Sequence, residues 1–541
     1  MRITTLITIA SAILFASCRT TTNPTPAMLD LKILNGRILD GTGAPWFRGD
    51  VGVRGDTIVT IGDLRDTAAK TTIDARGQLV SPGFIDLLGW SQTAVLDDPQ
   101  LEAKVRQGVT TEIGGEGESP GPSKDGRFRT LGAFLDTIDK QGAAVNFAML
   151  LGGSNPRGMV IGNVNRPPTM DEMKQMEAIA EQAMRDGAIG IGTSLIYVPA
   201  MYSTTEELVN LSKVAARYGG VYFTHMRDEG DRIDAALDET FRIGREAGIP
   251  VNIWHLKIGP RANWGKMPHV IERIEQARAE GIDASANIYP YAASSTSLST
   301  LAPDWAMEGG YEQLRVRLRN PDDRAKILEA FRRQYDRRGD RGIYVGQIYN
   351  AEQAQYQKKF IEQIAAERNT TVDEALAWLF ETNEQSPRVI FFSMSEEDVR
   401  YALRQPWISI GSDAAAPPPK MRAENTAVHP RAYGSFPRVL GHYARDEKLM
   451  PVEEAVRRMT SQAALRANLR DRGVVREGMK AALVVFDPAA VRDLSTFEDP
   501  HHFSEGIIDV IVNGVPVLRD GAMTGALPGR SIRGRGYEPA R

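Results

Sequence analysis

The feature that most constrains this chain is a set of short apolar segments, each followed by a residue that can bind a metal or move a proton. Three of them are VYFT before His225, VNIW before His255 and ISIGS before Asp413, and a fourth, TTEIGG, precedes Glu116. The two histidines are separated by about one strand–helix repeat. This pattern predicts parallel strands that present the four side chains together at their carboxyl ends, as in a (β/α)8 TIM barrel.

The central part of the chain, residues 81–470, alternates strand-like segments with amphipathic stretches that have helical spacing. Such alternation is typical of a parallel α/β fold. The alternation of strands and helices is interrupted near 300–345, where the sequence is polar and helical. We therefore expect an insertion near the barrel mouth. This insertion is either a lid over the active site or a surface segment without a role in catalysis. Further segments expected to be strands are VNFAML (145–150), AIGIGTSL (188–195), IDASANIYP (282–290) and VIFFS (389–393).

The two ends of the mature chain are rich in short β-like runs separated by turn residues. Residues 29–80 contain LDLKILNGRILDG and DVGVRGDTIVTIGD, and residues 471–541 contain AALVVFDP and GIIDVIVNGVPVLRDG. Turn residues between β-rich runs indicate antiparallel strands. We therefore expect one small β-sandwich domain formed from both termini.

The first 18 residues resemble a lipoprotein signal peptide: one arginine, a short apolar stretch, then Ala-Ser-Cys. Cys18 is the only cysteine, at the position where lipid attachment would follow cleavage. A plain secretory signal cleaved nearby is the alternative. Residues 19–28 form a Thr/Pro tether. The expectation is an exported, periplasmic protein, lipid-anchored to the outer membrane through Cys18 and without a disulfide.

The charge balance argues against nucleic acid as a partner. The formal net charge is -4, and the one dense basic run, 331–341, is interrupted by aspartates. A small-molecule substrate is the expected partner, with membrane contact only through the lipid anchor.

The residues at the strand tips suggest zinc chemistry. Imidazole and carboxylate groups are typical zinc ligands, and a catalytic site leaves one position open for water or substrate. His225 and His255 are the first candidate ligands, and Glu116 is preferred over Glu112 and Glu118 because it lies at the strand tip. A carboxylate at Asp413 can accept a proton from water and pass it to a leaving amine. The alternative for Asp413 is a helix cap or an Asx turn.

Several other residues are candidates to hold the substrate. Lys257 lies two residues beyond His255, on the same face of an extended segment. Arg431 lies in HPRAYGSFPR, and its guanidinium can bind a carboxylate through two hydrogen bonds. Candidates for the pocket wall are Tyr197, Tyr289, Tyr291 and Ser295.

Taken together, the motifs resemble the N-acyl-D-amino-acid deacylase (D-aminoacylase) group of the amidohydrolase superfamily. The segments that carry the resemblance, in order, are ILDGTG, SPGFID, QGVTTEI, GAIGIGTSLIYVPA, THMRDE, IGSD, HPRAYGSFPRVLGHY and GVVREGMKAALVVFDP. The resemblance implies a (β/α)8 barrel with a β-sandwich, an insertion near the mouth, and zinc-dependent hydrolysis of an N-acyl-D-amino acid. It places the metal-binding histidines at His225 and His255 and the catalytic aspartate at Asp413.

The chain departs from this group at two motifs. The usual His-x-His after GFID is replaced by Leu88 and Trp90, neither of which can bind zinc, and a usual cysteine ligand is replaced by Glu116. The remaining set implies one zinc ion per chain, held by Glu116, His225 and His255, similar to the single-metal arrangement of N-acetylglucosamine-6-phosphate deacetylases. The alternatives are a dipeptidase or cyclic-amide hydrolase of the same superfamily, or an inactive binding protein that retains the barrel.

Overall fold

The computed structural model describes residues 28–539, whose central feature is a closed barrel of eight parallel strands, with two short strands in line counted as one. In barrel order the strands are β6 (Phe84–Asp86), β7 (Val109–Gly114), β8 (Asn146–Met149) with β9 (Leu151–Gly152), β10 (Gly190–Ser194), β11 (Val221–His225), β12 (Val251–Ile253), β13 (Ala284–Ile288) and β18 (Ile408–Ile410). A parallel bridge between Gly89 and Ala414 closes the ring by joining the chain after β6 to the chain after β18. The predicted barrel is therefore confirmed.

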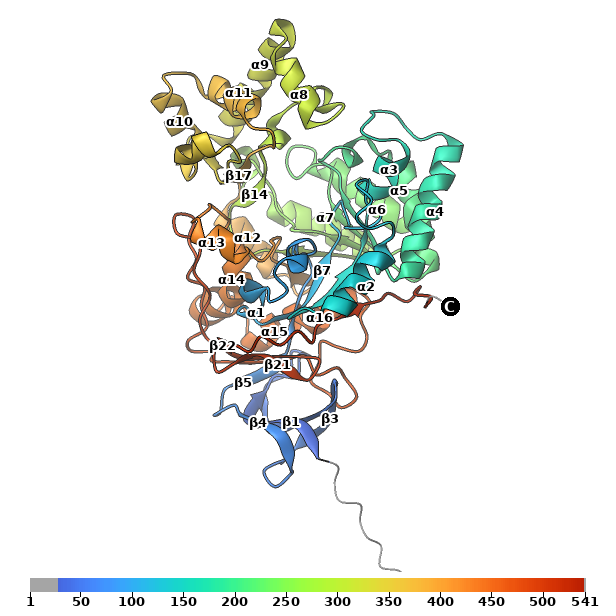
Figure 1. Ribbon diagram of the computed structural model, residues 1–541, viewed down its shortest axis with the longest axis vertical. Coiled ribbons are helices and arrows are strands. Elements are labelled where there is room, and N and C mark those ends of the chain that lie inside the picture. Colours follow the sequence, from blue (N-terminus) through green and yellow to red (C-terminus); the bar gives the residue numbers. More distant parts are fainter. Residues whose placement is uncertain (1–27, 540–541) are drawn as a thin grey trace, which may run out of the picture.

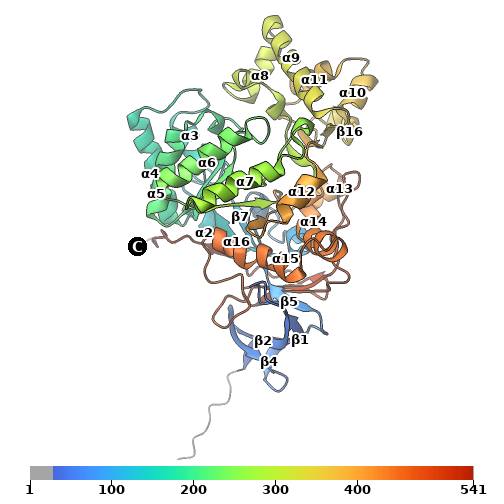
Figure 2. The ribbon, with the colours of Figure 1, turned by 180° about the vertical axis from the view of Figure 1, so that it is seen from behind.

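Helices surround this barrel (Figures 1 and 2), and their buried apolar residues belong to its core. Helix α4 shows why they form: Thr169 and Glu172 make a capping box at its start, and Met176, Ala180 and Met184 face the core. The principal outer helices are α2 (Leu131–Gln141), α4 (Met170–Asp186), α5 (Thr205–Arg217), α6 (Ile233–Ala247), α7 (Met267–Ala279), α12 (Glu396–Leu403), α15 (Val452–Met459) and α16 (Ser461–Arg466). Shorter helices near the strand ends are α1 (Glu102–Val105), α3 (Ser154–Val160), α13 (Pro419–Ala423) and α14 (Arg431–Arg438).

Both ends of the described chain contribute to one sheet at the lower end of the molecule in Figure 1. Its strands are β1 (Leu29–Ile38), β2 (Phe47–Arg54), β3 (Thr57–Gly62), β4 (Ala69–Asp74) and β5 (Leu79–Pro82) from the first end, and β19 (Leu483–Phe486), β20 (Ile507–Val512), β21 (Val515–Arg519) and β22 (Ala522–Met523) from the second. The two groups meet where β5 pairs antiparallel with β19. The β-sandwich predicted from both termini is thus present. One segment differs from the expectation for 471–541, because β23 (Ser531–Ile532) leaves the sandwich and pairs with β8 of the barrel.

The insertion forms a unit with its own core, opposite the sandwich (Figures 1 and 2). Its elements are β14 (Ser294–Ser297), α8 (Tyr311–Leu318), α9 (Pro321–Arg338), β15 (Ile343–Val345), β16 (Lys359–Phe360), α10 (Ile361–Glu367), α11 (Val372–Thr382) and β17 (Arg388–Phe391). The stacked rings of Phe331 and Phe380, 5.2 Å apart, lie in its core. It therefore runs from 294 to 391, well beyond the expected 300–345. The VIFFS segment belongs to it, since β17 pairs antiparallel with β14 and β15 and not with a barrel strand.

Within the described residues, no helix combines the length and apolar character needed to cross a bilayer. The predicted signal peptide, 1–18, with its lipid-attachment residue Cys18, lies outside the described residues, as does all but the last residue of the predicted tether.

Candidate metal centre and active site

Three buried side chains meet at the carboxyl ends of the barrel strands. The Oε1 atom of Glu116 lies 2.9 Å from Nδ1 of His225 and 3.2 Å from Nε2 of His255, and these two nitrogens are 2.9 Å apart. Within the described part of the chain, this is the group of three or more His, Cys, Asp or Glu side chains with metal-binding geometry. The structure thus brings together the three residues that the sequence analysis named as ligands.

The local backbone explains how these side chains come to point inward. Gly115 has a φ of +103°, and a Cβ atom there would lie 2.3 Å from the carbonyl oxygen of Leu150, so only glycine lets β7 turn into Glu116. His255 and Asp413 have φ values of 38° and 51°, in the left-handed region that side-chain-bearing residues seldom adopt. Their N–H groups donate to Asn287 Oδ1 at 2.6 Å and to the Leu88 carbonyl at 2.8 Å. Backbone strain of this kind, held by the surrounding structure, is concentrated at functional sites in proteins.

The electrostatics of the cluster fit a bound cation. Burial raises the pKa of Glu116, but hydrogen bonds with His225 and His255 outweigh it and hold this pKa well below the usual range. The second carboxylate oxygen, Oε2, is buried and has no hydrogen-bond partner among the described residues. A buried carboxylate with an unpartnered oxygen is costly unless a ligand completes it. One carboxylate and two imidazoles are also the donor types that zinc prefers, so these residues fit a zinc ion.

The pKa of His255 is raised by its carboxylate neighbours. Burial and the nearby Lys257 ammonium lower it, but the carboxylates, with Glu229 first among them, outweigh both and raise the pKa to about 9. Without a metal, this imidazole therefore holds a proton at neutral pH that a metal ion must displace.

Asp413 has a partner on each of its carboxylate oxygens. Arg431 Nη1 lies 2.6 Å from Oδ2, and Trp90 donates its indole N–H to Oδ1 at 3.1 Å. The Trp90 backbone N–H also donates to the Ala414 carbonyl at 3.2 Å, so the segment after β6 runs alongside the segment after β18. These contacts fix the orientation of the carboxylate. The Trp90 side chain therefore contacts Asp413 directly, at a position where the sequence analysis expected a metal ligand to be missing.

Lys257 and Glu229 form a charged pair beside the histidines. Lys257 Nζ lies 2.6 Å from Glu229 Oε1 and 2.7 Å from Nδ1 of His255. Burial raises the pKa of Glu229, but His225, Lys257 and His255 outweigh it and hold that pKa well below its usual range. Glu229 was not among the predicted residues.

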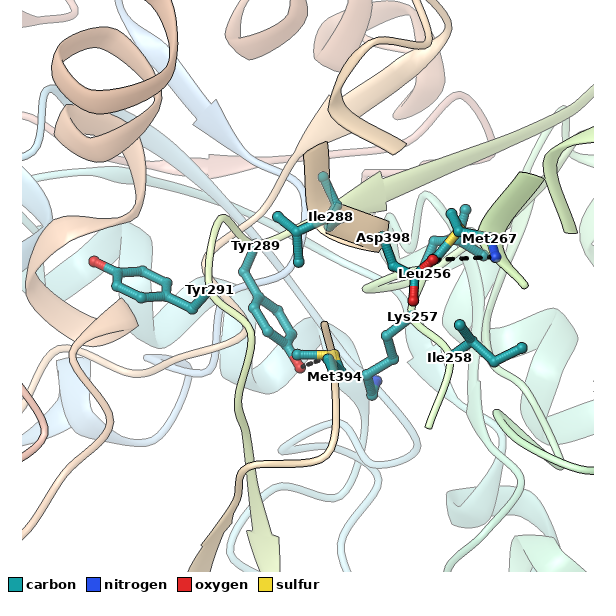
Figure 3. Close-up of a pocket in the computed structure, with 10 residues that line it drawn as sticks. Leu256, Lys257, Ile258, Met267, Ile288, Tyr289, Tyr291, Met394 and Asp398 are labelled. Carbon is teal, nitrogen blue, oxygen red and sulfur yellow. Dashed lines mark hydrogen bonds between the residues drawn. The ribbon is translucent and has the colours of Figure 1, made fainter. Parts of the chain in front are cut away.

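The predicted wall residues divide into two groups. Tyr197 lies with its ring centroid 5.7 Å from that of His225, and Tyr289 lies beneath the Arg431 guanidinium at 4.6 Å. Tyr291 points away from Tyr289 in Figure 3, and its hydroxyl donates to Asp493 Oδ2 at 3.3 Å. The prediction that Tyr291 lines the substrate pocket is therefore not supported by its placement, because the hydroxyl is engaged by a segment that follows the barrel.

Ser295 contacts the site through its backbone carbonyl and not through its hydroxyl. It lies in β14, at the start of the insertion, and its carbonyl accepts a hydrogen bond from Arg431 Nη2 at 3.1 Å. The insertion therefore holds the guanidinium that contacts Asp413. Tyr197 hydrogen-bonds Thr296 of the same strand, which connects the insertion to the site a second time.

A small cavity lies behind Lys257 and Tyr289 and is drawn in Figure 3. Its volume is about 10 Å³, and its walls are mainly apolar. A space of this size holds at most one water molecule, so it is not the substrate pocket.

A second buried charge cluster supports the backbone on either side of Asp413. Lys104 Nζ donates to Asp86 Oδ2 at 2.7 Å, to Ser412 Oγ at 2.8 Å and to the Ala414 carbonyl at 2.6 Å. Glu112 lies 3.4 Å from the same ammonium, and its Oε1 accepts the Ser91 N–H at 2.6 Å. Glu112, a competing ligand candidate in the sequence, is thus part of this cluster. Its alternative, Glu118, is exposed to solvent.

Sequence reasoning missed three polar residues around the site: Glu229, the indole of Trp90, and His429. His429 is buried, and its Nε2 lies 2.9 Å from the Ala293 carbonyl while its Nδ1 accepts the Arg431 N–H at 3.0 Å. Glu229 carries a usable signal, since it stands four residues after a strand-tip histidine in THMRDE.

Comparisons with known proteins show which family the chain resembles. The chain matches the model of the Amidohydrolase family over residues 71–518. It is 38% identical to a D-aminoacylase of Alcaligenes xylosoxydans xylosoxydans, over 93% of this chain and 97% of that protein.

Two solved structures are similar over their whole length. A D-aminoacylase with a binuclear metal centre, described by one-metal activation and second-metal attenuation, has 36% identity and a TM-score of 0.79, covering 94% of this chain and 100% of its own. The N-acyl-D-glutamate deacylase of Bordetella bronchiseptica, complexed with zinc and a phosphonate mimic of the tetrahedral intermediate, has 31% identity and a TM-score of 0.79, with the same coverage.

Proposed function

Because this chain belongs to the amidohydrolase family, we propose that it is a zinc-dependent enzyme that hydrolyses the amide bond of an N-acyl-D-amino acid or a similar small N-acyl or peptide substrate. The observation that carries the proposal is the buried cluster of Glu116, His225 and His255, with one carboxylate oxygen left without a partner. The deacylases that resemble the chain over most of its length support the substrate class.

We propose one zinc ion per chain, held by Glu116, His225 and His255. The described residues offer this one cluster of three ligands, and Leu88 and Trp90 carry no group that binds zinc. A zinc ion at this position supplies Lewis-acid polarisation of the scissile carbonyl and lowers the pKa of bound water toward about 7. In the related D-aminoacylase one metal is the activating one, which supports a single-metal centre here.

Asp413 is the proposed general base and acid. Its Oδ1 accepts the Trp90 indole N–H and its Oδ2 forms an ion pair with Arg431, and each oxygen keeps a lone pair for a proton. The carboxylate removes a proton from the attacking water and delivers it to the leaving amine, so the carboxylate is regenerated at the end of the reaction. The two fixed contacts hold it in one orientation while it does so.

Arg431 and Lys257 are the proposed partners of the substrate carboxylate. The Arg431 side chain is buried, and its Nε has no hydrogen-bond partner among the described residues, which leaves a donor for a ligand. The Lys257 side chain is 12% exposed and is already paired with Glu229. Tyr197 and Tyr289 supply flat apolar surface on either side of the histidines.

The test combines metal analysis with two variants and one matched control. Purified protein should contain about one zinc per chain, Glu116→Ala should lose it, and Asp413→Asn should keep zinc but lose hydrolysis. Glu118→Ala, an exposed carboxylate in the same turn, should keep both. A panel of N-acyl-D- and N-acyl-L-amino acids, dipeptides and cyclic amides then identifies the substrate. Absence of zinc, together with no effect of either variant on any hydrolysis, would refute the proposal.

We also propose that the chain is exported and anchored by a lipid at Cys18, from its first 18 residues alone. The measurement is metabolic labelling with a radioactive fatty acid followed by membrane fractionation. Label and membrane association should both be lost in Cys18→Ala. An unlabelled wild-type protein found in the soluble fraction would favour a plain secretory signal.

A further inference from the structure

Glu229 occupies a central place beside the metal cluster without belonging to it. It lies in the loop between β11 and α6, four residues after His225, and its side chain is 17% exposed. Its Oε1 lies 3.1 Å from Nδ1 of His255 and 2.6 Å from Lys257 Nζ, and its Oε2 lies 3.5 Å from Nε2 of His225. One carboxylate oxygen is therefore within hydrogen-bond distance of His255, while the other approaches His225, whose Nε2 has no hydrogen-bond partner among the described residues.

The ring nitrogens of the two histidines are divided between two carboxylates. His225 Nδ1 and His255 Nε2 face Glu116, 2.9 and 3.2 Å from its Oε1, and these are the atoms of the candidate metal site. The opposite nitrogens, His225 Nε2 and His255 Nδ1, face Glu229. A neutral imidazole has one lone pair and one N–H, so a nitrogen can bind a metal only when the other nitrogen carries the proton.

Lys257 influences which nitrogen of His255 carries the proton. Its ammonium lies 2.7 Å from Nδ1 of His255 and can only donate. A hydrogen bond from Lys257 to Nδ1 would put the imidazole proton on Nε2, which then could not bind a metal. Glu229 Oε1 offers an acceptor to both the ammonium and an Nδ1–H, so it competes with the hydrogen bond from Lys257 to Nδ1.

We propose that Glu229 is a positioning residue that accepts a hydrogen bond from Nδ1–H of His255, places its other oxygen beside Nε2 of His225, and thereby favours the tautomers in which both inward nitrogens are free to bind zinc. This inference rests on the proposed zinc site. Carboxylates that accept the second N–H of a ligating histidine orient the ring and increase its basicity, and their loss typically weakens metal binding about 10–100-fold.

The test measures zinc affinity, by competition with a chromophoric chelator, in the wild type and in Glu229→Gln. The amide keeps the size of the side chain but lacks the charge and one acceptor oxygen, and the affinity should fall about 10–100-fold. Glu229→Asp keeps the charge but is one methylene shorter, so it cannot reach both rings and should also bind zinc more weakly. The matched control is Glu239→Gln, which breaks an ion pair to Arg227 at 2.9 Å on the adjacent helix and touches neither histidine.

Two further measurements distinguish positioning from damage to the fold. The circular dichroism spectrum of the zinc-free protein should be the same in Glu229→Gln and in the wild type, because the variant keeps the fold although it loses the ion pair with Lys257. The visible spectrum of the cobalt-substituted protein should change in Glu229→Gln and Glu229→Asp but not in Glu239→Gln, because only the first two alter the ligand orientation. Zinc affinities within twofold of the wild type in both Glu229 variants would overturn the inference and leave the proposed function standing. A wild type that binds no zinc would overturn the proposed function itself.

Discussion

Replacing Lys104 with methionine tests the buried charge cluster that holds the backbone around Asp413. Lys104 and Asp86 are both fully buried, and their charged atoms are 2.7 Å apart. Methionine fills a similar volume but has no charge and no donor. The substitution therefore leaves the Asp86 carboxylate in the core without its cation, and the Ala414 carbonyl loses its hydrogen bond from Nζ.

The expected loss of stability depends on the hydrogen bonds that Asp86 still accepts after Lys104 is replaced. Removing one partner of a buried ion pair costs about 3–5 kcal/mol, because the remaining charge is buried and uncompensated. Asp86 still accepts the Ser412 N–H at 2.8 Å, the Ser412 hydroxyl at 2.6 Å and the Leu88 N–H at 3.2 Å. These donors partly stabilise Asp86. Glu112, which also loses the ammonium at 3.4 Å, has a pKa raised by burial and can take up a proton, so we expect a loss near the lower limit, about 3 kcal/mol of the free energy of unfolding.

The assay is urea unfolding, followed by circular dichroism. With a dependence of about 3 kcal/mol per molar urea, the midpoint for Lys104→Met should fall by about 1 M. Adding Asp86→Asn removes the stranded charge and should restore at least half of the loss, which makes the two substitutions non-additive. The control is Lys480→Met, which breaks a half-exposed pair with Asp56 and should cost below about 1 kcal/mol. An unchanged midpoint in Lys104→Met, or simple additivity in the double variant, would refute the reasoning.

Two further predictions concern the active site. Trp90→Phe removes the N–H that Asp413 accepts and should lower kcat about 10–100-fold with little change in KM, since a hydrogen bond to a charged group contributes about 1.5–3 kcal/mol. Trp407→Phe, which removes an indole contact to an exposed carboxylate before β18, should leave steady-state kinetics unchanged, and an equal effect of both substitutions would contradict this role. Because the His255 pKa is raised to about 9, zinc must displace a proton at lower pH, so affinity should rise up to about tenfold per pH unit towards that value. Calorimetric titration with zinc in buffers of different ionisation enthalpy measures the released proton. A zinc affinity that does not change between about pH 6 and 8 would contradict this prediction.

The fold was largely predictable because its signals are local. Parallel strands alternating with amphipathic helices, and strand-rich ends, together indicate a barrel with a sandwich. The limits of the insertion were not predictable. The sequence of β17 is apolar, like that of a barrel strand. Only its pairing with β14 and β15 shows that it belongs to the insertion. Pairing partners of this kind depend on contacts distant in sequence.

The site was predictable where geometry follows from strand ends, and less so elsewhere. Glu116, His225 and His255 each follow a strand of the same barrel, and parallel strands bring their carboxyl ends to one face. Tyr291 also stands close to a barrel strand, yet its hydroxyl bonds Asp493, about 200 residues later, and the sequence near 291 contains no sign of this. Glu229 lies in a loop, where no periodicity reports the direction of a side chain.

The pairing of β5 with β19 has a consequence for how the protein is made. Pro82 and Leu483 are partners in this ladder and lie about 400 residues apart in the chain. A ribosome adds about 5–20 residues per second, so the free edge of β5 waits roughly 20–80 s for its partner to be synthesised. An unpaired strand edge is a template for aggregation during that interval. The nascent chain should therefore depend on holding chaperones until the last hundred residues have emerged, and shortening the protein from its C-terminal end should produce insoluble product rather than a truncated active barrel.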